Sequence, residues 1–225
     1  MDIVFANASA KFANRNVLEP LSIRLTEHRI GIIGLNGSGK STFARMINGL
    51  VFPHAGSVVT NGFETRQDAE RVRSIVGYIF QNPANQIVLP VVRDDIALGM
   101  KRLRLGTREV EQRVSDVLAR LGIGHLAERR AHELSGGEVQ LVALAAVLAT
   151  SPDIVIMDEP TNQLDLRNRN MVTRTIRDLV EDVIVVTHDL ALLANFDRVL
   201  LFHEGRILAD GAAENVIARY EELVQ

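Results

Sequence analysis

The sequence predicts an α/β fold built around a parallel β-sheet, and two observations support this class. Short apolar runs rich in β-branched residues alternate with segments whose apolar residues recur at helical spacing. These runs lack the apolar–polar alternation of a half-solvated sheet, so we expect strands that are buried on both faces. A glycine-rich loop also follows one run and opens a helix, as is common in open α/β sheets.

The individual elements follow from the same patterns. A small antiparallel part is expected at the N-terminus, with strands at residues 2–5, 22–26 and 57–62. Strands of the parallel sheet are expected at 29–34, 76–80, 153–158 and 182–186. Helices are expected to follow three of them, at 40–50, 166–180 and 190–194. A hairpin that turns at Glu204-Gly205 is expected at 198–211, and a closing helix at 213–224.

The middle of the chain reads differently, because helix follows helix between residues 82 and 132 without a buried-strand run. The chain has 225 residues, which is about one and a half domains at roughly 150 residues per domain. We therefore expect one domain in which residues 1–81 and 150–225 form the core and residues 82–149 form a helical insert with the helix that follows it.

The composition excludes several classes of protein. The apolar fraction of 47% and charged fraction of 24% are those of a globular chain. The absence of cysteine excludes disulfides, thiolate metal sites and a cysteine nucleophile. A net charge of −3 argues against a nucleic-acid partner. Neither a bilayer-spanning run nor a signal peptide is visible, so we expect a chain that is soluble when isolated and cytoplasmic.

The glycine-rich loop has the sequence GLNGSGKST and matches the pattern G-x-x-x-x-G-K-[ST] between a strand and a helix. Main-chain N–H groups in such a loop, together with the helix N-terminus, bind phosphate oxygens. Lys40 is expected to neutralise the β- and γ-phosphates, and the Ser41 hydroxyl to ligate Mg²⁺. The alternative, a turn without a ligand, is disfavoured by the strand–helix context. The predicted phosphate-binding residues are Asn36, Gly37, Ser38, Gly39, Lys40, Ser41 and Thr42.

Two acids, Asp158 and Glu159, follow the apolar run IVIM. On its own, such a pair is more often a loop start or a helix cap. Beside a phosphate loop the functional interpretation is favoured, because ligands of open α/β sheets bind at the carboxyl ends of the strands. Asp158 is then expected to hold Mg²⁺, and Glu159 to accept a proton from the attacking water.

A second glycine pair lies in the sequence LSGGE, in which Ser135 and Glu138 have the spacing of a capping box. Capping explains the serine and the glutamate but not Gly136 and Gly137, since each glycine costs a helix about 1 kcal/mol against alanine. Two interpretations stay open: a well-capped buried helix, or a helix end that an anion approaches closely.

The motifs GLNGSGKST, LSGGE and IVIMDEP, in this order, resemble those of the nucleotide-binding subunits of ABC transporters, and LSGGE matches the signature motif of that family. The resemblance covers nearly the whole chain. It implies a P-loop NTPase (RecA-like) core with an antiparallel β subdomain and a helical subdomain. It also implies ATP and Mg²⁺ as ligands, and ATP hydrolysis.

From local chemistry alone, the next residues would be interpreted as ordinary surface or core residues. The resemblance implies functional roles for them. Phe12 matches the aromatic residue that stacks on adenine, and Gln81 the Q-loop glutamine that contacts Mg²⁺ or the attacking water. Asp165 matches the D-loop aspartate, and His188 the switch histidine at the γ-phosphate. In the implied head-to-tail dimer, ATP lies between Lys40 of one chain and residues 135–138 of an identical or paralogous chain.

The segment Tyr78–Gly99 is similar to the ATPases of energy-coupling-factor importers, which take up vitamins or metal ions. This likeness implies a transmembrane coupling subunit and a substrate-binding membrane subunit as partners, at the cytoplasmic face of the membrane. The sequence DEPTNQLD and the short chain favour a biotin importer. The alternatives are another ABC importer or an exporter, or a soluble ABC ATPase that acts on ribosomes or DNA.

Overall fold

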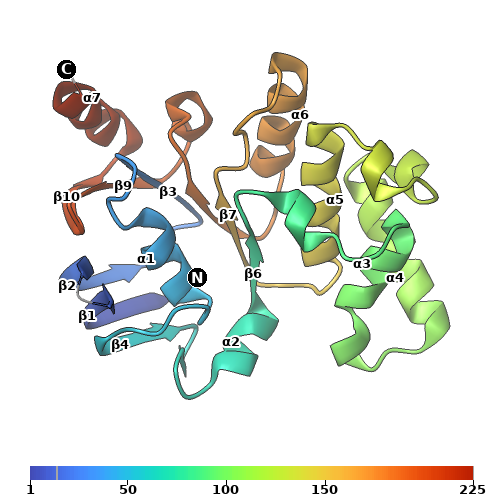
Figure 1. Cartoon of the computed structure of the whole chain (residues 1–225), viewed down its shortest axis with the longest axis horizontal. Helices are drawn as coiled ribbons and strands as arrows, with labels where there is room; N and C mark the ends of the chain where they lie inside the picture. The colour runs from blue at the N-terminus through green and yellow to red at the C-terminus, as the bar shows by residue number, and fades with distance from the viewer. Residues whose placement is uncertain (14, 225) are drawn as a thin grey trace. The chain divides into compact units, whose positions relative to one another are not determined.

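The computed structural model describes residues 1–13 and 15–224 of the chain. It divides into two compact units, which are described one at a time (Figure 1). The first comprises Met1–Gly77, Asp153–Glu159 and Glu181–Gln225, and the second Tyr78–Pro152 and Pro160–Val180. Pro160–Val180 lies in the second unit, together with the residues from the middle of the chain.

The first unit contains a four-stranded antiparallel sheet with the order β2-β1-β4-β5. Its strands are β1 (Ile3–Phe12), β2 (Arg15–Leu25), β4 (Ala55–Thr60) and β5 (Phe63–Glu64). The first two are much longer than the segments expected from the sequence. The β1–β2 pairing has register shifts between Phe5 and Lys11, and each shift interrupts the two-residue alternation on which the prediction depended.

A six-stranded sheet has the order β10-β9-β3-β8-β7-β6. Its strands are β3 (Arg29–Gly34), β6 (Val76–Ile79), β7 (Ile154–Asp158), β8 (Asp182–Val186), β9 (Arg198–His203) and β10 (Arg206–Gly211). Strand β3 runs parallel to both β8 and β9, and β7 runs parallel to β8. The parallel sheet and the β9–β10 hairpin are therefore confirmed, and β9 joins the sheet beside β3.

Helix α1 (Lys40–Ile47) links the two sheets through its buried aromatic residue. Phe43 stacks on Phe5 of β1 with ring centroids 4.3 Å apart, and lies 5.0 Å from Phe202 of β9. The closing helix α7 (Ala213–Val224) has the expected bounds. The helix predicted at 190–194 is wrong, because Leu190–Leu193 forms a single 3₁₀ turn. Helix α2 (Ala69–Ile75) was not expected.

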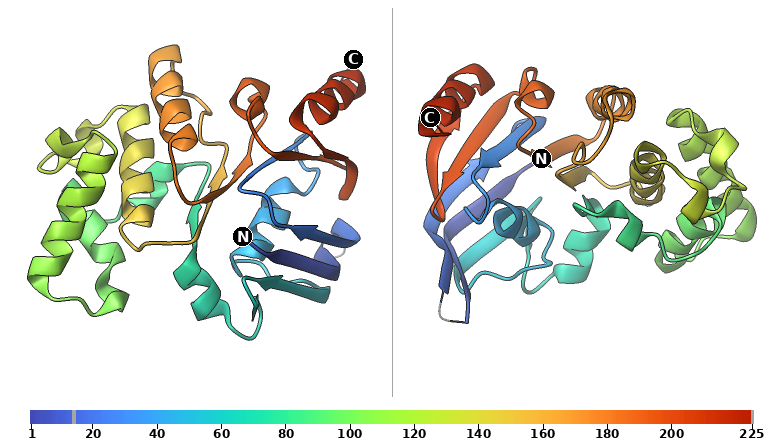
Figure 2. Two further views of the ribbon diagram at one scale, coloured as in Figure 1. Left: turned by 180° about the vertical axis from the view of Figure 1, so that it is seen from behind. Right: turned by 45° about the horizontal axis from the view of Figure 1, so that its top comes forward.

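The second unit is helical, as Figure 2 shows. Its helices are α3 (Val92–Gly99), α4 (Thr107–Arg120), α5 (Gly136–Leu148) and α6 (Leu166–Arg177). Helix α5 is apolar on nearly all sides and packs against α3, α4 and α6, so it forms the core of the unit. Over the described part of the chain, none of the helices combines the length and hydrophobicity needed to cross a bilayer.

Candidate active site

The phosphate loop connects β3, which ends at Gly34, with α1, which begins at Lys40. The Lys40 ammonium folds back over the loop and donates to the carbonyl oxygens of Gly34 at 2.8 Å and Leu35 at 3.0 Å. Burial lowers the pKa of Lys40, and the charges of Glu159 and Asp158 oppose that shift. A desolvated cation thus lies at the mouth of the loop.

The base of the loop is closely packed. At Gly39 φ is 102°, and a β-carbon there would lie 2.6 Å from Leu18 Cδ2 and 2.8 Å from the Val17 carbonyl oxygen, so glycine is required. Ser38 is 4% exposed, and its buried hydroxyl finds no hydrogen-bond partner among the described residues. A buried hydroxyl without a partner is costly, and a phosphate oxygen of ATP would satisfy it.

Two of the predicted magnesium ligands, Ser41 and Asp158, are in contact with each other. Ser41 Oγ donates to Asp158 Oδ1 at 3.0 Å, and Asp158 is only 2% exposed. The Arg45 guanidinium lies 3.6 Å from the other carboxylate oxygen. Mg²⁺ prefers hard oxygen ligands and commonly takes only one or two from the protein, with the rest from water and phosphate. This hydroxyl–carboxylate pair therefore fits the metal that the sequence predicts.

Glu159 and His188 are in direct contact. Glu159 Oε2 accepts a hydrogen bond from the His188 main-chain N–H at 3.2 Å and lies 2.8 Å from its Nδ1. The Glu159 main chain donates to the Val186 carbonyl at 2.7 Å. Its φ is 55°, an uncommon value for a residue with a side chain, and one that often marks functional sites. The end of β7 and the segment after β8 thus fix the carboxylate.

In the second unit the LSGGE segment forms the expected capping box. Glu138 N donates to Ser135 Oγ at 3.4 Å, and Ser135 N donates to Glu138 Oε2 at 2.7 Å. The latter bond is the main cause of the lowered pKa of Glu138. The helix α5 therefore starts where the sequence predicts, with its first N–H groups at the glycine pair.

The glycine pair also has a packing explanation within its own unit. A β-carbon on Gly137 would lie 2.6 Å from Asn168 Oδ1 and 2.7 Å from both Asn168 Cβ and Cγ. Asp165 caps α6 by accepting from the Asn168 main-chain N–H at 2.8 Å and its side-chain amide at 3.0 Å. Asn168 thus joins the predicted D-loop residue to the start of α5. Asn168 is not among the residues predicted from the sequence, since nothing in its local pattern marks it.

The remaining predicted residues are placed as follows. Phe12 ends β1 with half of its surface exposed, so a ring face is accessible for stacking. Gln81 is exposed after β6. Five residues further on, Gln86 accepts from Phe80 N at 2.8 Å and donates to the Tyr78 carbonyl at 3.0 Å. Gln86 therefore restrains the strand end that carries Gln81.

Comparison with known proteins supports the resemblance noted from the motifs. The family model described as ABC transporter matches residues 18–162. The biotin transport ATP-binding protein BioM of Rhizobium etli is 58% identical over 223 residues, covering 99% of each chain. The energy-coupling factor transporter ATP-binding protein EcfA1 of Bacillus subtilis is 39% identical over 230 residues, covering 100% of this chain and 81% of its own.

A solved structure agrees with the fold. That of cbiO1 from Clostridium perfringens, described as part of the ABC transporter complex cbiONQ, superposes with a TM-score of 0.87 at 28% identity, covering 99% of this chain and 92% of its own. The expected fold class, an ABC ATPase with antiparallel and helical parts, is confirmed. The chain therefore belongs to the ABC transporter family, and its relatives there include ATP-binding proteins of biotin and energy-coupling-factor transporters.

Proposed function

We propose that this chain binds and hydrolyses ATP as the motor subunit of an energy-coupling-factor importer, with biotin as the favoured substrate. The observation that carries the proposal is the 58% identity to a biotin transport ATP-binding protein over nearly the full length of both chains. A second protein with the same name, from Rhodobacter capsulatus, is 44% identical over 209 residues. Such identity supports a shared partner set as well as a shared fold.

Binding of ATP is assigned to the phosphate loop and Lys40. The main-chain N–H groups of residues 36–42 donate to the phosphates, and the Lys40 ammonium leaves its two carbonyl partners for the β- and γ-phosphates. Phe12 stacks on the adenine ring. Ser41 and Asp158 hold Mg²⁺, which when bound neutralises phosphate charge.

Hydrolysis is assigned to Glu159. Its carboxylate accepts the proton of a water molecule that attacks the γ-phosphate. His188 supports this role, because its main-chain N–H and its imidazole hold the carboxylate in one orientation. Gln81 orients the water or the metal. The positive φ of Glu159 is the local cost of this orientation.

A complete site requires a second ATPase chain, identical or paralogous, in a head-to-tail dimer. Residues 135–138 and Asp165 of that chain bind the γ-phosphate side of the nucleotide. The capped start of α5 suits this role, because its free N–H groups and helix dipole favour an anion.

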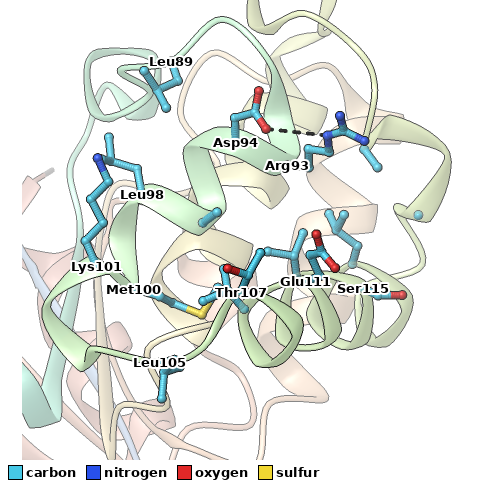
Figure 3. Close-up of a pocket in the computed structure, with 16 residues that line it drawn as sticks. Leu89, Arg93, Asp94, Leu98, Met100, Lys101, Leu105, Thr107, Glu111 and Ser115 are labelled. Carbon is cyan, nitrogen blue, oxygen red and sulfur yellow. Dashed lines mark ion pairs between the residues drawn. The ribbon is translucent and has the colours of Figure 1, made fainter.

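The membrane partners are assigned to the second unit. Helices α3 and α4 and the segment that connects them enclose a mostly apolar pocket, lined by residues that include Leu98, Met100 and Leu105 (Figure 3). The ion pair between Arg93 and Asp94, at 3.5 Å, lies on its wall. Apolar hollows with charged edges suit the docking of a partner helix, here from the transmembrane coupling subunit, with a substrate-binding membrane subunit beside it. The chain would then work at the cytoplasmic face of the membrane.

Two measurements test the proposal. Purified wild-type chain should hydrolyse ATP in the presence of Mg²⁺, and Glu159→Gln should bind ATP, lose turnover and accumulate as a closed dimer. Turnover of Glu159→Gln at the wild-type rate would refute the assignment of the base. Affinity purification from membranes should recover a coupling subunit and a biotin-binding membrane subunit. Recovery of an unrelated importer or exporter subunit would refute the energy-coupling-factor assignment, and recovery of ribosomes or DNA would refute a transport role.

A further inference from the structure

We propose that Gly205, in the turn between β9 and β10, is a positioning residue that holds the phosphate loop in its binding conformation. The inference rests on the proposed role of that loop in binding ATP. Gly205 has no reactive group and lies 165 positions after Lys40 (205 − 40). Its contribution comes from the main chain alone.

Both main-chain groups of Gly205 are used, and they join two different segments. Its N–H donates to the Ser38 carbonyl at 3.1 Å, and its carbonyl accepts from the Glu19 N–H at 3.0 Å. Ser38 is buried and directly precedes Gly39, the N-cap of α1. Glu19 belongs to β2. One residue therefore ties the phosphate loop to the antiparallel sheet.

The turn requires glycine for two separate reasons. Its φ of +77° lies in the left-handed region, which side chains disfavour. A β-carbon at Gly205 would also lie 2.8 Å from the Val17 carbonyl oxygen. Since that atom belongs to the main chain of a paired strand, a larger residue must displace the turn. Displacement would lengthen the bond to Ser38.

The Val17 carbonyl also restricts the size of the residue at position 39 of the phosphate loop. A β-carbon on Gly39 would lie 2.8 Å from the same oxygen. The β9–β10 turn and the phosphate loop thus pack against one atom of β2. Strand β2 further pairs Arg15 with Phe12, the predicted adenine-stacking residue. Movement of the turn would therefore alter both the loop amides and the strand that carries the ring.

Binding of phosphate by fixed N–H groups is sensitive to such movement, because a misplacement of about 1 Å in a preorganised site can cost on the order of a hundredfold. We expect Gly205→Ala to weaken ATP binding by about tenfold or more. The effect should appear as a raised Kd and KM for ATP, with a smaller change in kcat once nucleotide is bound.

Gly62→Ala provides the matched control. Gly62 also has a left-handed φ, +84°, but among the described residues a β-carbon added there would meet no atom within 4 Å apart from those of its two chain neighbours. Both variants carry the conformational cost of alanine in that region, so both should lower Tm in the absence of nucleotide. Only Gly205→Ala disturbs the loop. Equilibrium binding of ATP should give a Kd for Gly62→Ala within about twofold of wild type. The same result for Gly205→Ala would overturn the proposal.

Amide hydrogen exchange on the wild-type chain tests the same contact without a substitution. ATP with Mg²⁺ should slow exchange at the Gly205 and Glu19 amides together with those of the loop, because ordering the loop orders both bonds. Protection of the loop without a change at those two amides would overturn the proposal. Failure of the wild-type chain to bind ATP would overturn the proposed function as well, whereas the outcomes above concern Gly205 alone.

Discussion

Substitution of Gly137 by alanine separates the two explanations of the glycine pair. The introduced β-carbon would lie 2.6–2.7 Å from three atoms of Asn168. Asn168→Gly deletes all three of those atoms. The two substitutions therefore form a cycle in which the same methyl group is added either with or without those three atoms beside it.

The expected free energies follow from this geometry. Alanine in place of glycine stabilises a helix by up to about 1 kcal/mol, whereas overpacking costs roughly 1–3 kcal/mol. Gly137→Ala should therefore lower the free energy of unfolding by up to about 2 kcal/mol in the wild-type background. In the Asn168→Gly background it should raise that free energy by up to about 1 kcal/mol. The coupling energy is then about 1–3 kcal/mol.

Urea unfolding of the four chains measures this coupling. Gly136→Ala is the control, because its β-carbon would lie 3.2 Å from the flexible end of Leu164 and does not involve Asn168. Effects of Gly137→Ala that are equal in both backgrounds within about 0.5 kcal/mol would refute the packing argument. The ATPase rate of the double variant then decides function: retained activity assigns Gly137 to packing, and lost activity assigns it to the approach of an anion.

Four further predictions concern single residues. Burial lowers the pKa of Lys40 from its ordinary 10.5. The unfolded chain therefore binds more protons than the folded chain at pH values between the lowered pKa and 10.5, so the free energy of unfolding should rise with pH there, while the affinity for ATP should fall as the ammonium loses its charge. Titrations with ATP from about pH 7 to about pH 10 check this, and a constant Kd would contradict it. Gln86→Leu removes two hydrogen bonds, one to the Phe80 N–H and one to the Tyr78 carbonyl, and should cost about 1–3 kcal/mol in thermal unfolding, with Gln86→Glu intermediate because it keeps the acceptor. Ser135→Ala removes the cap of α5 and should cost about 1 kcal/mol, which Ser135→Thr should largely restore. The lowered pKa of Glu138 adds stability above the ordinary glutamate pKa, and that stability should be lost as the pH falls through the lowered value.

The sequence predicts the bounds of a helix or strand most accurately where a single hydrophobic pattern defines that element. The bounds of β3, β8 and α7 match, because uninterrupted apolar runs or a single amphipathic pattern define them. The β1 strand is underestimated since its register shifts break the alternation. The apolar segment at 190–194 suggests a helix, but Leu190–Leu193 is one 3₁₀ turn. Short local patterns cannot decide between these states without the tertiary contacts.

The residues of the candidate site likewise fall into those that the sequence identifies and those that it does not. Lys40, Ser41, Asp158, Glu159 and His188 come from motifs, and in the first unit they form contacts with one another or with shared neighbours. Their side-chain chemistry is readable because only certain groups can bind phosphate, hold a metal or accept a proton. Asn168 and Gly205 are not readable in this way, because each acts through packing or the main chain on a segment distant in sequence.

The Val17 carbonyl illustrates why residues outside the motifs, such as Gly205, matter for function. It belongs to an ordinary strand residue, yet it excludes a β-carbon from both Gly39 and Gly205. The phosphate-loop motif identifies the first glycine, Gly39, because that loop has a fixed local pattern. No local pattern identifies the second glycine, although its N–H donates to the Ser38 carbonyl within that loop. The placement of the N–H donors that bind phosphate therefore depends on residues outside the motif. The affinity for ATP depends on the contacts that hold those donors in place as well as on the motif itself.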